Sequence, residues 1–432
     1  MDSGGESEYA LHGKALYRIS SVQVKNAMTI DAKTFRRGRF KGTEVMVTVK
    51  DALQAPGHDR NERPGSVADT ERPPEWGQVQ VEMTSRCNLR CATCLYPAYE
   101  DRWRPEDLSS GVFSKLLKIA HRCDSVHLQG WGETLMRGDT AQRIADLRRV
   151  GTRPTLGSNG STMTPEAARE LIDSGLASMT FSLAGPDQAS HDGLRGRGTF
   201  AATVAAIQTF VAQRGKDRKP PVLINYLLTP YSFPRLPQAL ALASRMGVDT
   251  LVATHLVHVC TPAQKKLIAY EAGRRLGWVL FRSRLAVLWR RTTLVLPGIQ
   301  GRPLPVCSKN PLRNLFVAAD GSVSPCVYLC PPLQGPYTQL VEGAEETRRR
   351  LVFGHLEEDD LDTIWDRPAY GRFRRAFQRR QDLYQELLPP ARTDFEGLDR
   401  LEKATRIIRK RFATPDYQPP EPCRGCPHLL GY

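Results

Sequence analysis

The stretch Glu82–Tyr96, which reads EMTSRCNLRCATCLY, holds three cysteines within eight residues: Cys87, Cys91 and Cys94. The spacing C-x3-C-x2-C lets one short loop place three thiolates on one face of an iron–sulfur cube, because thiolates are the usual protein ligands of such clusters. The fourth iron would then lack a protein ligand, and an open position is what a metal site needs to bind another molecule. The alternatives are a structural zinc knuckle, which usually needs a fourth ligand that the neighbouring sequence does not offer, or three unrelated buried thiols.

The composition is that of a large globular chain. With 432 residues, 41% of them apolar, it can bury one large core and a smaller domain. No apolar run approaches the length of a membrane span, and the first ten residues lack the pattern of a signal peptide, so we expect a soluble, cytoplasmic protein. Eight of the ten cysteines fall in two regions, which in an intracellular chain indicates metal or redox chemistry and not disulfides.

The charge is positive and unevenly distributed. The chain has 61 Lys and Arg against 46 Asp and Glu, a net charge of +15. Eight basic residues lie between positions 261 and 291, with Glu271 as the one acid. This basic segment is either a solvated helix face or an electrostatic funnel for an acidic or phosphorylated substrate.

From residue 77 onward, short apolar runs alternate with helical patterns, as in βα units around a parallel sheet. Thr164 before Pro165 is a suitable helix N-cap followed by proline at the first helical position. The predicted strands are 79–83, 125–129, 154–157, 178–183, 222–228 and 250–257, and the predicted helices are 110–122, 140–150, 165–174, 201–213 and 234–246. Six such units predict an α/β fold, a partial (β/α)6 barrel.

The sequence CNLRCATC after an apolar strand resembles the radical S-adenosylmethionine (SAM) superfamily. In that family the open iron of a [4Fe–4S] cluster chelates SAM. The resemblance implies that the reduced cluster cleaves SAM to a 5′-deoxyadenosyl radical, which abstracts a substrate hydrogen, and that a flavodoxin- or ferredoxin-type protein donates the electron. One departure is Thr93, where the family usually has an aromatic residue.

The resemblance also implies a set of SAM-binding residues at the C-terminal ends of successive strands, where barrel sites lie. The sequence GWGE at 130–133 resembles the family's G-G-E motif, whose backbone and acid hold the SAM ammonium group. Polar side chains after the next two strands and an arginine, which can bond both oxygens of a carboxylate, complete the set. Singly, each of these could be a turn residue or part of a surface ion pair. The expected residues are Gly130, Trp131, Gly132, Glu133, Ser158, Asn159, Ser182 and Arg195.

The last predicted strand leads to His255, His258 and Cys260. A histidine near a strand end is more often structural than catalytic. A thiol near a substrate radical could donate a hydrogen atom, as an epimerase requires, so Cys260 is a candidate catalytic thiol, although a buried apolar cysteine is the commoner case.

A second group of cysteines lies near the end of the sequence. Cys307 precedes a predicted hairpin (315–318 and 323–327) that turns at Asp320-Gly321, and Cys326 lies on its second strand. Cys423 and Cys426 form a C-x2-C pair. Four thiolates suit either zinc or a fully ligated [4Fe–4S] cluster. The pattern C-x13-G-x4-C resembles the SPASM/twitch extension of radical SAM enzymes, which implies one auxiliary [4Fe–4S] cluster. Its expected ligands are Cys307, Cys326, Cys423 and Cys426, with Cys330 as a spare or alternate ligand or a catalytic thiol.

These patterns divide the chain into four segments: an N-terminal extension and linker (1–76), a radical SAM core (77–260), a basic insert (261–306) and a twitch-like hairpin/helix iron–sulfur domain (307–432). The expected reaction is oxidation or epimerisation of a small hydroxylated or aminated natural-product intermediate, as in the 2-deoxy-scyllo-inosamine dehydrogenase family. The alternative is a SPASM-type peptide maturase, which is less favoured because residues 1–76 lack a convincing peptide-clasping pattern. A non-catalytic, zinc-stabilised nucleic-acid binder would leave the SAM-binding residues unexplained.

Overall fold

The computed structural model describes residues 75–270, 275–287, 290–298, 301–341, 344–388 and 395–432. Every element described below lies within the unit Ala52–Tyr432. The predicted N-terminal extension and linker fall almost entirely outside the described residues.

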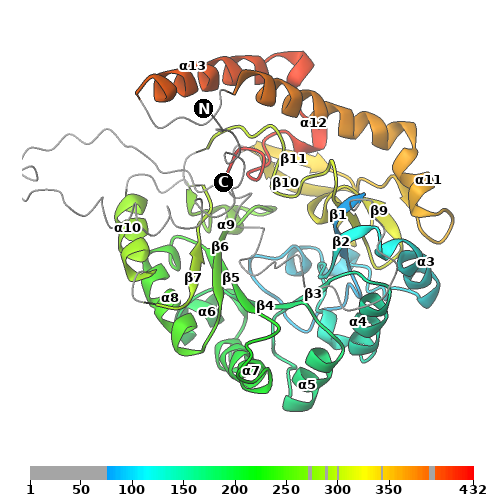
Figure 1. The fold of residues 1–432 in the computed structure, drawn as a ribbon, viewed down its shortest axis with the longest axis vertical. Helices are drawn as coiled ribbons and strands as arrows, with labels where there is room; N and C mark the ends of the chain where they lie inside the picture. Colours follow the sequence, from blue (N-terminus) through cyan, green and yellow to red (C-terminus); the bar gives the residue numbers. More distant parts are fainter. Residues whose placement is uncertain (1–74, 271–274, 288–289, 299–300, 342–343, 389–394) are drawn as a thin grey trace, which may run out of the picture. The chain divides into compact units, whose positions relative to one another are not determined.

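A ten-stranded sheet is the frame of the described part of the chain (Figure 1). Its central strands run parallel in chain order, which confirms the predicted α/β fold with a parallel sheet. In β5 the burial alternates residue by residue, because one face packs against helices and the other lines the barrel interior. The central strands are β1 (Trp76–Val81), β2 (Cys123–Leu128), β3 (Pro154–Ser158), β4 (Ser178–Leu183), β5 (Val222–Leu228) and β6 (Thr250–His255).

Helices cover the outer face of these strands (Figure 1). The predicted N-cap is present, since the Thr164 hydroxyl accepts a hydrogen bond from the Ala167 N–H at 3.1 Å. Strands and helices share one continuous apolar core, which includes Phe181, Phe210 and Ile224. The helices of this layer are α3 (Ser110–Ala120), α4 (Thr140–Arg149), α5 (Pro165–Asp173), α6 (Gln188–Arg195), α7 (Thr199–Gln213) and α8 (Leu236–Arg245).

The segment predicted as a basic insert is part of the barrel. It contains α9 (Pro262–Lys265), α10 (Arg275–Val287), which packs against α8, and β7 (Thr293–Val295), which pairs in parallel with β6. A three-residue strand is too short to leave a recognisable pattern in the sequence. The sheet therefore continues past the sixth predicted strand.

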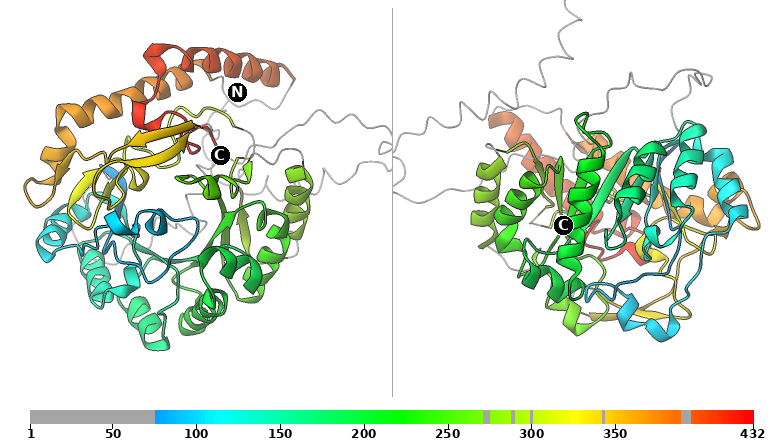
Figure 2. Two further views of the ribbon diagram at one scale, coloured as in Figure 1. Left: turned by 180° about the vertical axis from the view of Figure 1, so that it is seen from behind. Right: turned by 90° about the horizontal axis from the view of Figure 1, so that it is seen from below.

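The C-terminal segment extends the same sheet at its other end. Strand β8 (Leu315–Val317) pairs in parallel with β1, and β9 (Ser322–Ser324) and β12 (Gly354–His355) follow it. Figure 2 shows the remaining C-terminal elements on one side of the barrel. They are the antiparallel hairpin β10 (Tyr337–Val341) and β11 (Ala344–Arg348), and helices α11 (Leu361–Asp366), α12 (Pro368–Leu387) and α13 (Phe395–Phe412). Within the described ranges, no helix is both long enough and apolar enough to cross a membrane.

Candidate metal and cofactor site

The first three cysteines lie in the loop that follows β1. The Cys94 N–H donates to the Cys91 carbonyl at 3.0 Å, and the Tyr96 N–H donates to the Cys94 sulfur at 3.5 Å. Burial raises the pKa of Cys87 to about 11 and that of Cys94 to about 12, and thiolate charge on Cys91 raises both pKa values further. Cysteines bind metal as thiolates, and burial disfavours that negative charge, so a bound metal cation would supply the positive charge that stabilises the thiolates of this loop.

A glutamine outside every sequence motif fixes the backbone of this loop. The Gln264 amide in α9 donates to the carbonyls of Ala92 at 3.1 Å and Cys94 at 2.9 Å. Its oxygen accepts a hydrogen bond from the Cys260 N–H at 2.8 Å. The segment after β6 therefore holds the cysteine loop in place, and no sequence signal pointed to Gln264.

The glycines of the GWGE sequence allow two loops to approach closely. A Cβ on Gly132 would lie 2.1 Å from the Thr84 carbonyl oxygen, and one on Gly130 would lie 2.4 Å from the Glu82 side chain. Glu82 is fully buried and accepts hydrogen bonds from the N–H groups of Trp131 at 2.6 Å and Ala319 at 3.2 Å. Sequence reasoning missed Glu82, although a carboxylate at the end of an apolar strand is a visible signal.

Glu133 joins the loops after β2 and β3. Its carboxylate accepts hydrogen bonds from the Ser158 hydroxyl at 2.7 Å, from the Asn159 N–H at 2.7 Å and from the Leu135 N–H at 3.1 Å. The Asn159 side-chain amide in turn donates to the Asn88 side chain at 3.0 Å. A carboxylate has about four acceptor positions, so Glu133 keeps one for a cofactor, and its contact with the SAM ammonium group stays a prediction.

Arg195 and Ser182 complete the predicted set. Arg195 ends α6, where its carbonyl oxygen lies 4.0 Å from the Cys91 sulfur, and its positive charge lowers the pKa of Cys87, Cys94 and Glu133. Its Nε atom is buried and has no hydrogen-bond partner in the described part of the chain. Ser182 is half-buried near the end of β4, beside Asn225 of β5. A guanidinium whose buried Nε is unpaired in the described part of the chain fits the carboxylate of SAM, so the residues present are compatible with this cofactor.

The two candidate catalytic thiols lie in different surroundings. Cys260 is buried against Leu95 and Tyr337, close enough to Cys94 for the charges of the two groups to interact. Cys330 is fully buried, and its sulfur accepts a hydrogen bond from Arg350 at 3.2 Å. Burial raises the pKa of both thiols to about 12. A catalytic role for either thiol stays a prediction.

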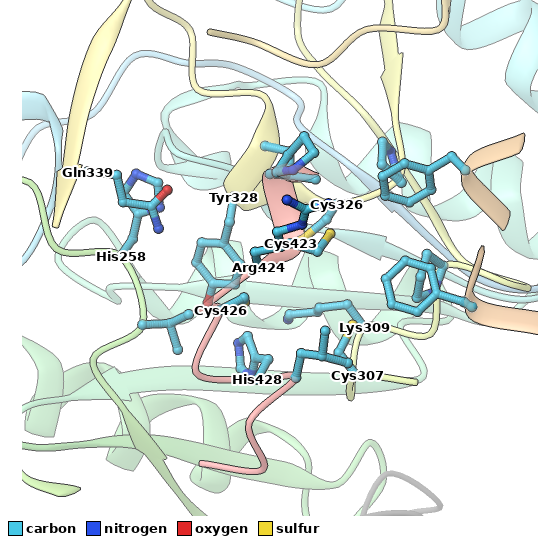
Figure 3. Close-up of a pocket in the computed structure, with 18 residues that line it drawn as sticks. His258, Cys307, Lys309, Cys326, Tyr328, Gln339, Cys423, Arg424, Cys426 and His428 are labelled. Carbon is cyan, nitrogen blue, oxygen red and sulfur yellow. The ribbon is translucent and has the colours of Figure 1, made fainter. Parts of the chain in front are cut away.

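The four predicted auxiliary cysteines line one cavity (Figure 3), whereas Cys330 does not line it. Burial raises the pKa of Cys326 to about 11 and that of Cys307 to about 12. Lys309 contributes a positive charge, with its Nζ 5.5 Å from the centre of the Tyr328 ring. Four thiols and an ammonium group suit a negatively charged iron–sulfur cluster. The lining cysteines are Cys307, Cys326, Cys423 and Cys426.

Within the described ranges, no three or more His, Cys, Asp or Glu side chains are grouped closely enough to hold a single metal ion. One ion draws all its ligands to about 2.0–2.3 Å. In a four-iron cluster each cysteine binds a different iron, so the sulfurs stay further apart.

Aromatic rings run continuously from the first cysteine loop to the auxiliary cavity. The ring centres are 4.5 Å apart for Tyr96 and Trp103, 6.3 Å for Trp103 and Trp131, and 6.2 Å for Trp131 and Tyr328. The Trp131 indole N–H donates to the Val327 carbonyl at 3.0 Å. The side chain of the predicted SAM-binding Trp131 thus contacts the C-terminal domain. This contact joins the two cysteine sites.

Comparison with known proteins agrees with this arrangement. The radical SAM superfamily model matches residues 81–243, and the SPASM iron–sulfur cluster-binding domain model matches residues 307–386. The tungsten-containing aldehyde ferredoxin oxidoreductase cofactor-modifying protein of Pyrococcus furiosus is 24% identical over 301 residues, 68% of this chain and 82% of that protein. The PqqA peptide cyclase of Xanthomonas campestris is 25% identical over 314 residues, 68% of this chain and 75% of that protein. The mycofactocin maturase MftC of Mycolicibacterium smegmatis is 29% identical over 178 residues, 40% of this chain and 43% of that protein.

The fold is also similar to that of Streptococcus suis SuiB bound to S-adenosylmethionine, with a TM-score of 0.53, 15% identity and coverage of 82% of this chain and 77% of SuiB. The two matched domains imply SAM and iron–sulfur clusters as cofactors. This chain therefore contains a radical SAM domain followed by a C-terminal iron–sulfur domain of the SPASM type.

Proposed function

We propose that this radical SAM enzyme modifies a peptide, as a maturase of the SPASM type. The observation that carries the proposal is the similarity to the PqqA peptide cyclase, which extends over more residues than the two matched domains together. A mycofactocin maturase is also similar, and the fold matches SuiB bound to its precursor peptide SuiA with a TM-score of 0.50, 14% identity and coverage of 95% of this chain and 88% of SuiB.

This proposal replaces the small-molecule substrate preferred from the sequence. That preference rested on residues 1–76, which lie almost entirely outside the described residues. The names of the related proteins support the peptide alternative better. The Pyrococcus furiosus relative is named as a cofactor-modifying protein, so the experiment must distinguish a peptide substrate from a non-peptide one.

The proposed roles follow from the contacts. Cys87, Cys91 and Cys94 bind the cluster that chelates SAM, and Arg195 holds the SAM carboxylate. When bound, the reduced cluster and SAM supply a 5′-deoxyadenosyl radical that removes a hydrogen atom from the substrate. The four C-terminal cysteines bind the auxiliary cluster. The charge of Cys260 interacts with that of Cys94 in the first cysteine loop, whereas the charges that act on Cys330 are those of Arg350, Asp320 and Glu82, so Cys260 is the preferred candidate catalytic thiol.

A protease experiment separates peptide from non-peptide substrates. The anaerobically reconstituted enzyme is incubated with SAM, dithionite and a low-molecular-mass cell extract, and 5′-deoxyadenosine is measured. We expect the extract to raise its formation above the uncoupled rate, and we expect protease treatment of the extract to abolish that rise. Stimulation that survives protease treatment would refute a peptide substrate.

The matched control removes the first cluster. A protein with Cys87, Cys91 and Cys94 all changed to Ala should lose about four irons and form no 5′-deoxyadenosine with any extract. Formation of 5′-deoxyadenosine by this variant would show that the radical chemistry has been assigned to the wrong cysteines.

A further inference from the structure

His258 follows β6 and lies between the barrel and the C-terminal domain. Its side chain is 4% exposed, and both of its ring nitrogens are buried without a hydrogen-bond partner in the described part of the chain. Buried polar groups are normally paired, because removing them from water without a partner destabilises the folded state. Two unpaired nitrogens on one ring therefore indicate a ligand that supplies the missing partners.

Aromatic rings enclose His258 on three sides. Its ring centre is 5.5 Å from Trp131, 6.1 Å from Tyr328 and 5.7 Å from Tyr337. Burial lowers its pKa to about 3, so the imidazole is neutral near pH 7 and has one donor and one acceptor nitrogen.

Gln339 lines the same cavity as His258, and both side chains are labelled in Figure 3. Gln339 and Tyr337 lie two residues apart on β10 and so share one face of the strand, and Tyr337 contacts His258. The Leu340 N–H donates to the Val259 carbonyl at 2.7 Å, which fixes β10 against the segment that carries His258. Gln339 is half-buried on β10 and lies at the wall of this cavity.

The two side chains together offer uncharged donors and acceptors. A peptide bond has one N–H donor and one C=O acceptor, and an imidazole beside a carboxamide can pair with both. The cavity also contains the auxiliary cysteines, and Trp131 joins it to the loop that carries the predicted SAM-binding residues.

We propose that His258 and Gln339 bind a backbone amide of the peptide substrate and hold the peptide between the two cluster sites. This inference rests on the proposed function. It adds the residues that recognise the peptide and the chemical group that they recognise.

The test uses the protease-sensitive fraction of the extract as the probe. Its concentration is varied with wild-type enzyme and with His258→Phe, Gln339→Leu and the double variant. We expect each single variant to raise the half-saturating concentration about tenfold or more. The double variant should raise it by less than the product of the two single effects, because both side chains bind one amide. His121→Phe, the same substitution at an exposed position at the end of α3, should behave as wild type.

Thermal unfolding distinguishes a binding role from a structural one. Replacing an unpartnered buried imidazole with an apolar ring of similar shape should leave the melting temperature unchanged or raise it. Wild-type half-saturation in the His258→Phe variant, or a lower melting temperature with loss of iron, would overturn the proposal. If wild-type enzyme itself does not respond to the fraction, the proposed function fails instead.

Discussion

Replacing Arg195 with Ala should weaken SAM binding without removing iron. The charge of the guanidinium acts on Cys94 in the cysteine loop, and its Nε is buried and unpaired in the described part of the chain, so a bound carboxylate would gain a charge-assisted hydrogen bond there. Losing such a bond costs about 1.5–3 kcal/mol. Since 1.4 kcal/mol corresponds to a tenfold change in affinity, the dissociation constant should rise roughly 10- to 150-fold.

Isothermal titration of SAM into the anaerobically reconstituted protein measures this change, with iron content determined on the same samples. Arg197→Ala is the matched control, because Arg197 is exposed two residues further along. Arg195→Lys should fall between wild type and Arg195→Ala, because an ammonium group keeps the charge but not the planar pair of donors. Unchanged SAM affinity in Arg195→Ala would refute the assignment, and loss of iron would show that Arg195 supports the loop itself.

Three further outcomes are expected. In the auxiliary cavity, Cys426→Ala should remove about four irons and Cys330→Ala none, as measured by iron analysis, because Cys426 lines the cavity and Cys330 does not. Iron loss from Cys330→Ala would contradict this site. Burial raises the pKa of Glu82 from 4.5 to about 7. As the pH rises, the Glu82 carboxyl therefore loses its proton at a lower pH in the unfolded chain than in the folded one. The free energy of unfolding of the wild type should fall by about 3 kcal/mol between pH 4.5 and 7. Unfolding followed at several pH values should show that Glu82→Gln lacks this loss, and an unchanged pH dependence would refute the assignment. Gly132→Ala would place a methyl group 2.1 Å from a backbone oxygen and should lower the free energy of unfolding by about 1–3 kcal/mol. Gly138→Ala, with open space around the added methyl group, should leave the free energy of unfolding unchanged. Equal melting temperatures for the two variants would show that the loops can separate.

The sequence by itself determined the features that depend on short spacing along the chain. C-x3-C-x2-C places three thiolates in one loop, whatever the rest of the molecule does. The alternating pattern of β5 and the N-cap at Thr164 are also local, because strand burial has a period of two and a cap involves residues three apart. The parallel sheet and its covering helices follow from such segments in order.

Only the tertiary structure decided which distant segments meet. Gln264 bonds to the loop of Cys94 across 170 positions, and Trp131 contacts Val327 across 196, and neither pairing leaves a pattern in the sequence. Strand β8 joins the sheet beside β1 through register and packing, which brings the C-terminal cysteines to the barrel. The unpaired nitrogens of His258 are likewise visible only in three dimensions, because the missing partner of a buried group is a property of everything packed around it.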